Sequence, residues 1–570
     1  MDRTIGTAAG QSGAPRRADA ELDVGSAATA LTVVQSGAQA AQTAWGAASG
    51  QVVVGAIPQQ PPGFLPRPAL LKQLYRADQA DSVVQVVQGK PGVGKTQLAA
   101  AYARARLAAG WRLVAWVDAE DAGCLLAGLA AVADATGLSD GGSRPDAVGP
   151  GGAVRRQLEA DGERCLLVFD NVETPDVVRP FLPVAGAARV LITTTQQSVA
   201  DLGTTIPVDV FSHPEARALL EGRTGLGAGA AALAAELGHL PLALNQAAAV
   251  MMMSGQYLSY DPYQERLRSL SVTEHLAPEQ DEPYPDGVAE AVLLSLGAVQ
   301  TSDRTGVCAR VMAIMAVLSA AGARRDLLYA AARAGALTDG GRRVEPGALD
   351  RALDQLVNRS LLMLSLDGQV VIPHRLIMRV VREALVRQGR LTVAYRAAAS
   401  MLLEYADTLM RSRDHHAARD ISQQVTALFD RFARTEAEAD KELSAVLLRL
   451  RFFSLYCLIE LGDGAPWAIE AGESLTADLG RVLGPSHRDA LTAQDNLAAA
   501  YRGAGRLTEA IPLFERTLAA RERLLGADDP RTVATRKSLT LACGEAARAE
   551  KADGAESVDQ VGGDLQDDGP

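Results

Sequence analysis

The stretch Gly89-Lys90-Pro91-Gly92-Val93-Gly94-Lys95-Thr96 fits the phosphate-binding pattern GxxxxGK[ST]. It lies between a short apolar run, Val83–Val87, and an Ala-rich segment, Gln97–Ala108, which are typical of a strand and a helix. The motif requires this context, because backbone N–H groups and the helix N-terminus surround bound phosphates. We expect Lys95 to reach the β- and γ-phosphates and the Thr96 hydroxyl to bind Mg²⁺. The predicted nucleotide contacts here are Gly89, Lys90, Pro91, Gly92, Val93, Gly94, Lys95, Thr96 and Gln97.

A second apolar run, Leu166–Phe169, ends in Asp170 and reads as a buried parallel strand. An acid at the carboxyl end of such a strand lies beside the phosphate site, so Asp170 is expected to bind Mg²⁺ through water. Lys95 and Asp170 are therefore the candidate catalytic residues. A third run, Val190–Thr194, ends in hydroxyls that either sense the γ-phosphate or simply reflect the β-propensity of Thr.

These three runs and a fourth, Leu113–Val117, alternate with Ala/Leu-rich helical stretches from Leu70 to Pro207, which indicates βα units and a parallel sheet. The pattern then becomes mostly helical up to Arg390. Near its end, Leu361–Leu366 and Gln369–Ile372 flank Asp367-Gly368, a strong hairpin signal. Helices followed by a hairpin predict a winged helix.

A repeat occupies the C-terminal part of the chain, with a shift of 42 residues between Leu483-Gly484 and Leu525-Gly526. At the same shift Leu491 matches Val533 and Ala468-Ile469 matches Ala510-Ile511. The pattern predicts a stack of helix pairs that resembles the long tetratricopeptide repeats of kinesin-light-chain type. Stacked helix pairs make a concave surface for a protein partner or ligand.

The fold class is therefore multidomain α/β plus α, with a P-loop NTPase sheet followed by helical units. The predicted division is a low-complexity arm (1–54), a P-loop nucleotide-binding domain (55–210), a helical subdomain (211–290), a winged-helix subdomain (291–390), tetratricopeptide-like repeats (391–548) and an acidic disordered tail (549–570).

Composition narrows the class of protein. The 570 residues carry 56 basic and 68 acidic side chains, a net charge of −12, which disfavours a generic polyanion binder. The five cysteines are scattered and odd in number, which disfavours a disulfide framework or a zinc site. No signal-peptide pattern or membrane-length apolar stretch is visible, so we expect a cytoplasmic protein without a membrane partner.

Taken together, the motifs resemble the NB-ARC ATPases of the STAND class. The motif order carries this resemblance: Phe64-Leu65-Pro66-Arg67, the P-loop, the Asp170 strand, Thr193-Thr194-Thr195, Gly238-His239-Leu240-Pro241-Leu242-Ala243-Leu244, and His374 after the hairpin. The resemblance implies that Arg67, Pro241 and His374 contact the nucleotide, which is ADP or ATP with Mg²⁺.

Two departures from that family concern hydrolysis. A second acid often ends the Asp170 strand, but position 171 is Asn, which cannot accept a proton from water at neutral pH. The family often has Arg after the paired threonines, where this chain has Thr195. Both departures predict at most a slow ATPase.

Three functions remain open from the sequence. The first is an ADP-locked signalling switch whose repeats sense a ligand and whose exchange to ATP drives homo-oligomerisation. The second is a DNA-associated regulator, because residues 291–390 hold 14 Arg against 8 acids, including Arg324-Arg325 and Arg342-Arg343. The third is a passive repeat scaffold braced by a structural nucleotide. The acidic chain disfavours DNA, and the family resemblance favours the switch.

Overall fold

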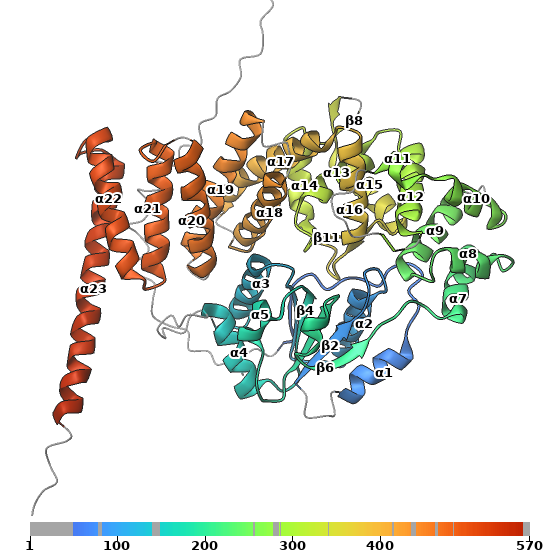
Figure 1. Ribbon diagram of the computed structural model, residues 1–570, viewed down its shortest axis with the longest axis horizontal. Helices are drawn as coiled ribbons and strands as arrows, with labels where there is room; N and C mark the ends of the chain where they lie inside the picture. Colours follow the sequence, from blue (N-terminus) through green and yellow to red (C-terminus); the bar gives the residue numbers. More distant parts are fainter. Residues whose placement is uncertain are drawn as a thin grey trace, which may run out of the picture.

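The computed structural model describes residues 50–77, 83–138, 149–254, 257–276, 284–285, 287–339, 341–412, 415–434, 440–461, 465–482 and 484–562. Most of the predicted arm, up to residue 49, lies outside the described residues, as does the end of the predicted tail, 563–570. A parallel sheet with helices on both faces forms the lower part of the molecule, and a row of helices rises from it and extends to one side (Figure 1).

Six parallel strands form the sheet, in the order β1-β3-β4-β5-β2-β6. The four predicted strands are all present, and the P-loop joins β2 to helix α2, as the motif requires. The sequence analysis missed both edge strands, of which β1 lies just before the predicted start of the domain at residue 55 and pairs with β3. The bounds are β1 Val52–Val54, β2 Val84–Gln88, β3 Leu113–Asp118, β4 Cys165–Val172, β5 Arg189–Thr194 and β6 Thr204–Pro207.

The central strands are apolar on both sides because both faces of the sheet are covered. Along β4, Leu166 and Val168 belong to the core that faces α2, whereas Leu167 and Phe169 belong to the core that faces α3 and α4. This alternation follows the two-residue period of a strand. The helices of this domain are α1 Pro68–Ala77, α2 Lys95–Ala108, α3 Ala122–Ala135, α4 Gly149–Asp161, α5 Pro175–Val178 and α6 Gln197–Ala200.

Helices follow the sheet, as predicted, and the predicted hairpin is present. Strands β10 and β11 pair antiparallel around Asp367-Gly368, and β7 completes a three-stranded sheet in the order β10-β11-β7. The elements are α7 His213–Thr224, α8 Ala230–Glu236, α9 Pro241–Ser254, α10 Asp261–Ser269, α11 Val272–His275, α12 Val288–Ser302, α13 Val307–Val317, β7 Ala323–Arg324, α14 Arg325–Arg333, β8 Thr338–Asp339, β9 Arg342–Arg343, α15 Pro346–Asn358, β10 Leu362–Leu364, β11 Val370–Pro373 and α16 Arg375–Arg387.

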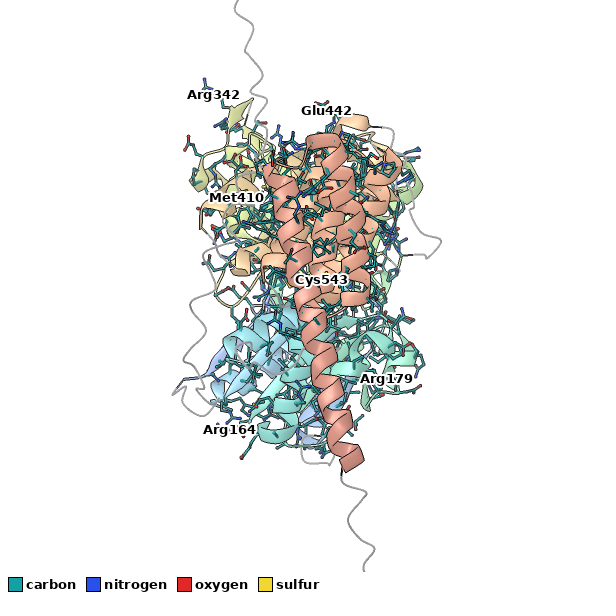
Figure 2. All side chains as sticks on the ribbon, turned by 90° about the vertical axis from the view of Figure 1, so that its left-hand side faces the viewer. Arg164, Arg179, Arg342, Met410, Glu442 and Cys543 are labelled. Carbon is teal, nitrogen blue, oxygen red and sulfur yellow. The ribbon has the colours of Figure 1, made fainter. Side chains whose placement is uncertain are left out.

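The last part of the chain is a row of helices, each packed on the next, which ends at α23 (Figures 1 and 2). Helix α23 continues through Gly562, so residues 549–562 are helical where the sequence predicts disorder. The segment lacks apolar periodicity, but it continues a helix that has already started, and extension of a helix costs less than its nucleation. The bounds are α17 Leu391–Ser412, α18 His415–Ala433, α19 Lys441–Leu461, α20 Ala465–Val482, α21 Arg488–Gly503, α22 Leu507–Leu525 and α23 Pro530–Gly562.

Two contacts fix these units around the sheet. Residues before α1 run beside the hairpin, where the Gln59 N–H donates to the Leu364 carbonyl at 2.9 Å. On the other side, α18 rests on α3 of the nucleotide-binding domain, and Arg419 pairs with Asp134 at 2.5 Å. The hairpin and helix α18 therefore both touch the domain that carries the P-loop.

Candidate nucleotide-binding site

The P-loop presents backbone donors with no side-chain competitor. Gly94 caps α2 in the left-handed region, with φ of 97°, and no side chain caps the helix. The first N–H groups of α2 therefore remain available to an anion, and the positive end of the helix dipole favours it. Gly89 lies so close to the adjoining strand that an added Cβ would sit 2.1 Å from the Val208 carbonyl oxygen. This close approach explains why the loop begins with glycine.

Lys95 is buried at the start of α2. Its ammonium donates to the Gly89 carbonyl at 2.9 Å and to the Lys90 carbonyl at 3.0 Å, both within its own loop. Burial lowers the pKa of Lys95 to about 8, with Asp170 opposing the shift and Arg375 adding to it. A negatively charged ligand at the loop would raise this pKa again and favour the charged ammonium.

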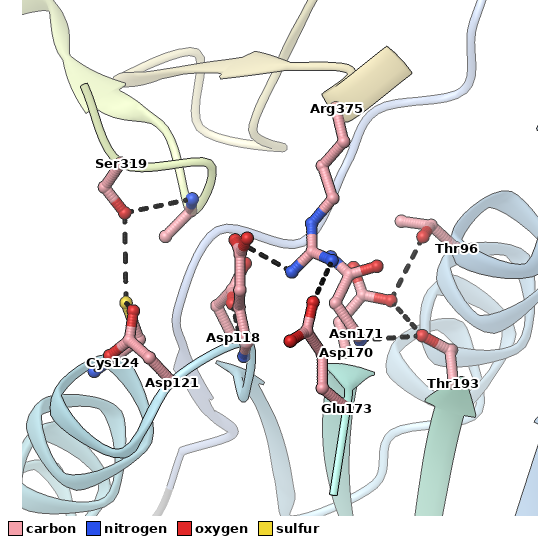
Figure 3. Close-up of polar contacts among 12 residues, drawn as sticks. Thr96, Asp118, Asp121, Cys124, Asp170, Asn171, Glu173, Thr193, Ser319 and Arg375 are labelled. Carbon is pink, nitrogen blue, oxygen red and sulfur yellow. Dashed lines mark hydrogen bonds and ion pairs between the residues drawn. The ribbon is translucent and has the colours of Figure 1, made fainter. Parts of the chain in front are cut away.

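Asp170 lies buried beside Thr96, as the sequence predicts. The Thr96 hydroxyl donates to Asp170 Oδ1 at 3.1 Å, and the Thr193 hydroxyl donates to the same oxygen (Figure 3). Burial raises the pKa of Asp170, although the hydrogen bonds from Thr193 and Thr96 act in the opposite direction. Thr193 orients the carboxylate, a role that the sequence analysis did not assign.

The remaining residues at this sheet edge concern hydrolysis. Asn171 lies within an irregularity of β4, between Phe169 and Val172, with φ of 66°, and its N–H donates to Thr193 Oγ1 at 2.9 Å. Thr194 donates to the Val172 carbonyl, and Thr195 is exposed at the edge of the cavity. Thr193 and Thr194 thus form hydrogen bonds to β4, whereas Thr195 lines the cavity.

The Pro241 turn packs directly on the P-loop. Gly238 and His239 both take positive φ, and Pro241 then starts α9, as its fixed φ favours. The Leu242 N–H lies 3.4 Å from the Gly92 carbonyl oxygen, and an added Cβ on Gly92 would meet the Leu240 side chain at 3.0 Å. A turn about 150 residues further along the chain is therefore part of the wall around the loop.

His374 lies at the N-terminus of α16 and lines the same cavity. Burial lowers its pKa to about 4, and the charges of Lys95 and Arg375 act in the same direction. Its Nδ1 atom is buried and has no hydrogen-bond partner among the described residues. A buried nitrogen without a partner carries a desolvation cost that a ligand can remove.

The cavity that joins these residues has a volume of about 1450 Å³ and reaches from the P-loop to α18. It brings together Lys95, Asp170, Pro241 and His374 as well as Gln97, whose amide nitrogen lies 3.0 Å from the Met363 sulfur of β10. These five residues, which were predicted to hold the nucleotide or Mg²⁺, therefore line one cavity.

Arg67 does not join them. Its guanidinium donates to the Asp209 carbonyl at 2.7 Å, lies 3.7 Å from Glu215 and stacks over Phe211. It ties the segment before α1 to the segment before α7, and it is absent from the residues that line the cavity. These contacts give Arg67 a structural role, and its contact with a nucleotide stays a prediction.

The basic residues that raised the DNA alternative are dispersed. Arg324 pairs with Asp326 at 3.2 Å and Asp420 at 3.5 Å, and Arg325 pairs with Asp350. Arg342 projects from the hairpin β8–β9, on the side of the molecule away from the nucleotide-binding sheet (Figure 2). Carboxylates therefore neutralise two of the arginines that raised this alternative, which weakens the case for phosphate contacts at this place.

The comparisons with known proteins bear on both ends of the chain. Residues 481–554 match the family model "Tetratricopeptide repeat". The predicted repeats are confirmed there. No curated protein matches the chain.

Several solved structures are similar in shape. One is a signal transduction ATPase with numerous domains (STAND) protein with a tetratricopeptide repeat sensor from Pyrococcus horikoshii, at 13% identity over 87% of this chain and 82% of that one, with a TM-score of 0.36. Another is a Walker-type ATPase of Pyrococcus abyssi, at 12% identity over 57% and 98%, with a TM-score of 0.27. A third is the ORC2 protein of Aeropyrum pernix, at 16% identity over 59% and 97%, with a TM-score of 0.26.

Across the described parts of the chain, no helix combines the length and the apolar character of a membrane span.

Proposed function

We propose that the chain is a nucleotide-operated signalling switch that holds ADP at rest and exchanges it for ATP. One observation carries the proposal: three elements from separate parts of the sequence, the P-loop, the start of α9 and the start of α16, line one cavity. A ligand in this cavity would stabilise the arrangement that brings the three elements together, and its loss or exchange would favour other arrangements.

The residues present fit a nucleotide and Mg²⁺. Phosphate oxygens are acceptors for the uncapped N–H groups of α2 and for the Lys95 ammonium, and they also suit a donor on the unpartnered His374 Nδ1. Thr96 Oγ1 and Asp170 would hold Mg²⁺, a cation that takes oxygen ligands and completes its shell with waters and phosphates. Among the described residues, no group of three or more His, Cys, Asp or Glu side chains forms a metal cage. When bound, Mg²⁺ supplies charge neutralisation of the phosphates.

The side chains of this chain are better suited to holding a nucleotide than to cleaving it. Asn171 is not a base, and Glu173, the nearest acid after β4, pairs with Arg375 at 3.4 Å. Asp170 is engaged by two hydroxyls. We therefore propose slow hydrolysis of ATP to ADP at most, with Lys95 and Asp170 positioning the phosphates and Mg²⁺.

The repeats are proposed to bias the switch by binding a protein partner or ligand. They touch the nucleotide-binding domain through α3, which follows β3 directly. Gln423 of α18 donates to the Cys124 sulfur of α3 at 2.8 Å, and Gln424 donates to the Gly322 carbonyl next to β7 at 2.7 Å. A partner that moved α18 would pull on both sides of the cavity, and release of this contact would free surface for self-association.

The test is the nucleotide that co-purifies with the chain, released by denaturation and identified by chromatography. We expect ADP at close to one equivalent, and a larger assembly in light scattering when Mg²⁺ and a non-hydrolysable ATP analogue replace it. A protein that carries no nucleotide and gains none from Mg-ADP or Mg-ATP would contradict the proposal and leave the passive scaffold. Bound nucleotide without any change of assembly would retain the site and reject the oligomerisation step.

A further inference from the structure

Arg375 lies in the cavity between the hairpin β10–β11 and the six-stranded sheet. It is the first residue of α16 and reaches toward the carboxyl ends of β3 and β4 (Figure 3). Its Nη2 lies 2.8 Å from Glu120 Oε2, and its Nη1 lies 3.4 Å from Glu173 Oε1. Glu120 follows β3 and Glu173 follows β4, so one guanidinium spans two strand ends.

The same guanidinium belongs to the phosphate end of the cavity. Arg375 lines the cavity with Lys95 and Asp170, and it is close enough that its charge contributes to lowering the pKa of both. Its Nε atom is buried without a hydrogen-bond partner among the described residues. The side chain therefore has donor capacity that the two glutamates leave unused.

A guanidinium binds carboxylate and phosphate with the same planar fork, so the two kinds of ligand compete for it. Thr195, on the neighbouring strand end, offers no positive charge to a third phosphate. Arg375 and Lys95 both line the cavity, and they are the two cations whose charges lower the pKa of Asp170.

We propose that Arg375 distinguishes ATP from ADP: it stays on Glu120 and Glu173 when the ligand is a diphosphate and transfers to the terminal phosphate of a triphosphate. This inference rests on the proposed function and identifies Arg375 as the residue that responds when ATP replaces ADP. Because Arg375 begins α16, its transfer would change the contacts that hold α16 to β3 and β4. The cavity would then differ between its two nucleotide states at this contact.

A purely structural clip makes a different prediction. If Arg375 only fastens α16 to the sheet, then Arg375→Ala, Glu120→Gln and Glu173→Gln break the same contact and shift nucleotide affinity in one direction. If Arg375 reads the third phosphate, removal of the arginine weakens ATP binding, whereas removal of its competitors strengthens it. The two roles therefore differ in sign.

The experiment measures the dissociation constants of Mg-ADP and of a non-hydrolysable Mg-ATP analogue by calorimetry, on the full chain freed of nucleotide. For Arg375→Ala we expect the preference for the ATP analogue over ADP to fall roughly tenfold or more, as for a lost charge-assisted hydrogen bond. For Glu120→Gln and Glu173→Gln we expect that preference to rise several-fold. Arg387→Ala, at the other end of α16, is the matched control and should leave it unchanged.

A double-mutant cycle separates competition from simple charge repulsion. When Glu120→Gln is added to Arg375→Ala, its effect on the preference should disappear. An unchanged preference in Arg375→Ala, shifts of equal sign in all three variants, or a Glu120→Gln effect that persists without the arginine would each overturn the inference. Should Arg375→Ala fail to fold, as judged by circular dichroism, the two glutamate variants still give the sign. Wild-type protein that binds neither nucleotide would instead reject the proposed function.

Discussion

The two sides of the cavity are built in different ways. The loop side is one contiguous stretch, residues 89–96, held by the sheet and by its own glycines. The opposite side is assembled from the start of α9 and the start of α16, which are separated by more than 130 residues. The first side is fixed once the sheet folds, whereas the second exists only while three units stay packed together. A switch can therefore change the second side without unfolding the first.

The largest effect is expected on the loop side, from Lys95→Ala. Loss of the ammonium removes the central charge for the phosphates, and we expect affinity for ADP and ATP to fall by roughly a hundredfold or more. Because the hydrogen bonds of Lys95 within the described residues go to two carbonyls of its own loop, the melting temperature of the nucleotide-free protein should change little. Titration with a fluorescent nucleotide measures the first quantity. Lys72→Ala, on the exposed surface of α1, is the control, and equal losses in both variants would contradict a specific role.

Gly89→Ala tests whether the loop side is rigid. The new methyl carbon would lie 2.1 Å from the Val208 carbonyl oxygen, so the backbone must move. We expect a loss of about 1–3 kcal/mol in the free energy of unfolding, measured with denaturant. Gly222→Ala is the matched control: it lies within α7, with no atom near the added carbon, and should be neutral or stabilising by about 0.5–1 kcal/mol. A Gly89→Ala protein as stable as the wild type would show that the loop adjusts to the added methyl group and is not rigid.

The same difference explains what the sequence could predict. The P-loop, Asp170 and the four central strands follow from local patterns, because each needs only a strand, a turn and a helix in order. Strand β1, Val52–Val54, consists of β-branched residues that favour a strand, but it was missed because it directly follows the low-complexity arm and was assigned to that arm. Strand β6 was missed because its partner, and not its composition, makes it a strand. Thr204–Pro207 is polar and ends in proline, and it pairs only because β2 is adjacent.

On the side of the cavity that is built from α9 and α16, the sequence could predict which residues matter but not which residues they contact. His374 and Pro241 came from a family resemblance, and both line the cavity, but Arg67 from the same resemblance packs elsewhere. Arg375 was not singled out by the sequence analysis. Its pairing with Glu120 joins residues 255 positions apart, a contact that no local pattern encodes.

Removal of side chains from the assembled side should have a smaller effect than Lys95→Ala. For His374→Ala and Pro241→Ala we expect about a tenfold loss of ADP affinity, mainly through faster release, because these residues contribute to closing the cavity. Stopped-flow displacement of a fluorescent ADP measures the release rate. Pro346→Ala is the matched control, since this proline starts α15 in the same way and does not line the cavity. Unchanged release in both cavity variants would contradict a lock on this side.

The smallest effect concerns pH and the unliganded protein. The pKa of His374 is lowered to about 4 in the folded state, whereas an unfolded histidine titrates near 6.5. As pH falls from about 6.5 toward 4, the unfolded chain takes up a proton that the folded one does not, so stability falls. Above pH 6.5 this contribution is fully present. We expect the loss of stability to amount to about 1 kcal/mol between pH 6.5 and 5.5.

His374→Gln isolates this contribution, because other titrating groups, such as the buried Asp118, remain in both proteins. Burial and Glu120 raise the pKa of Asp118, so its effect on stability has the opposite sign, and only the difference between wild type and variant reports His374. The free energy of unfolding of both proteins, measured in denaturant at several pH values, gives that difference. In the absence of nucleotide, the free energy of unfolding of the wild type minus that of the variant should fall on acidification. With ADP bound the trend should weaken, because a phosphate beside the imidazole favours its charged form and brings the folded pKa closer to the unfolded one. If this difference changes neither with pH nor with ADP, His374 lies outside the phosphate site. Of the two elements of the assembled side, α9 alone would then contact the loop.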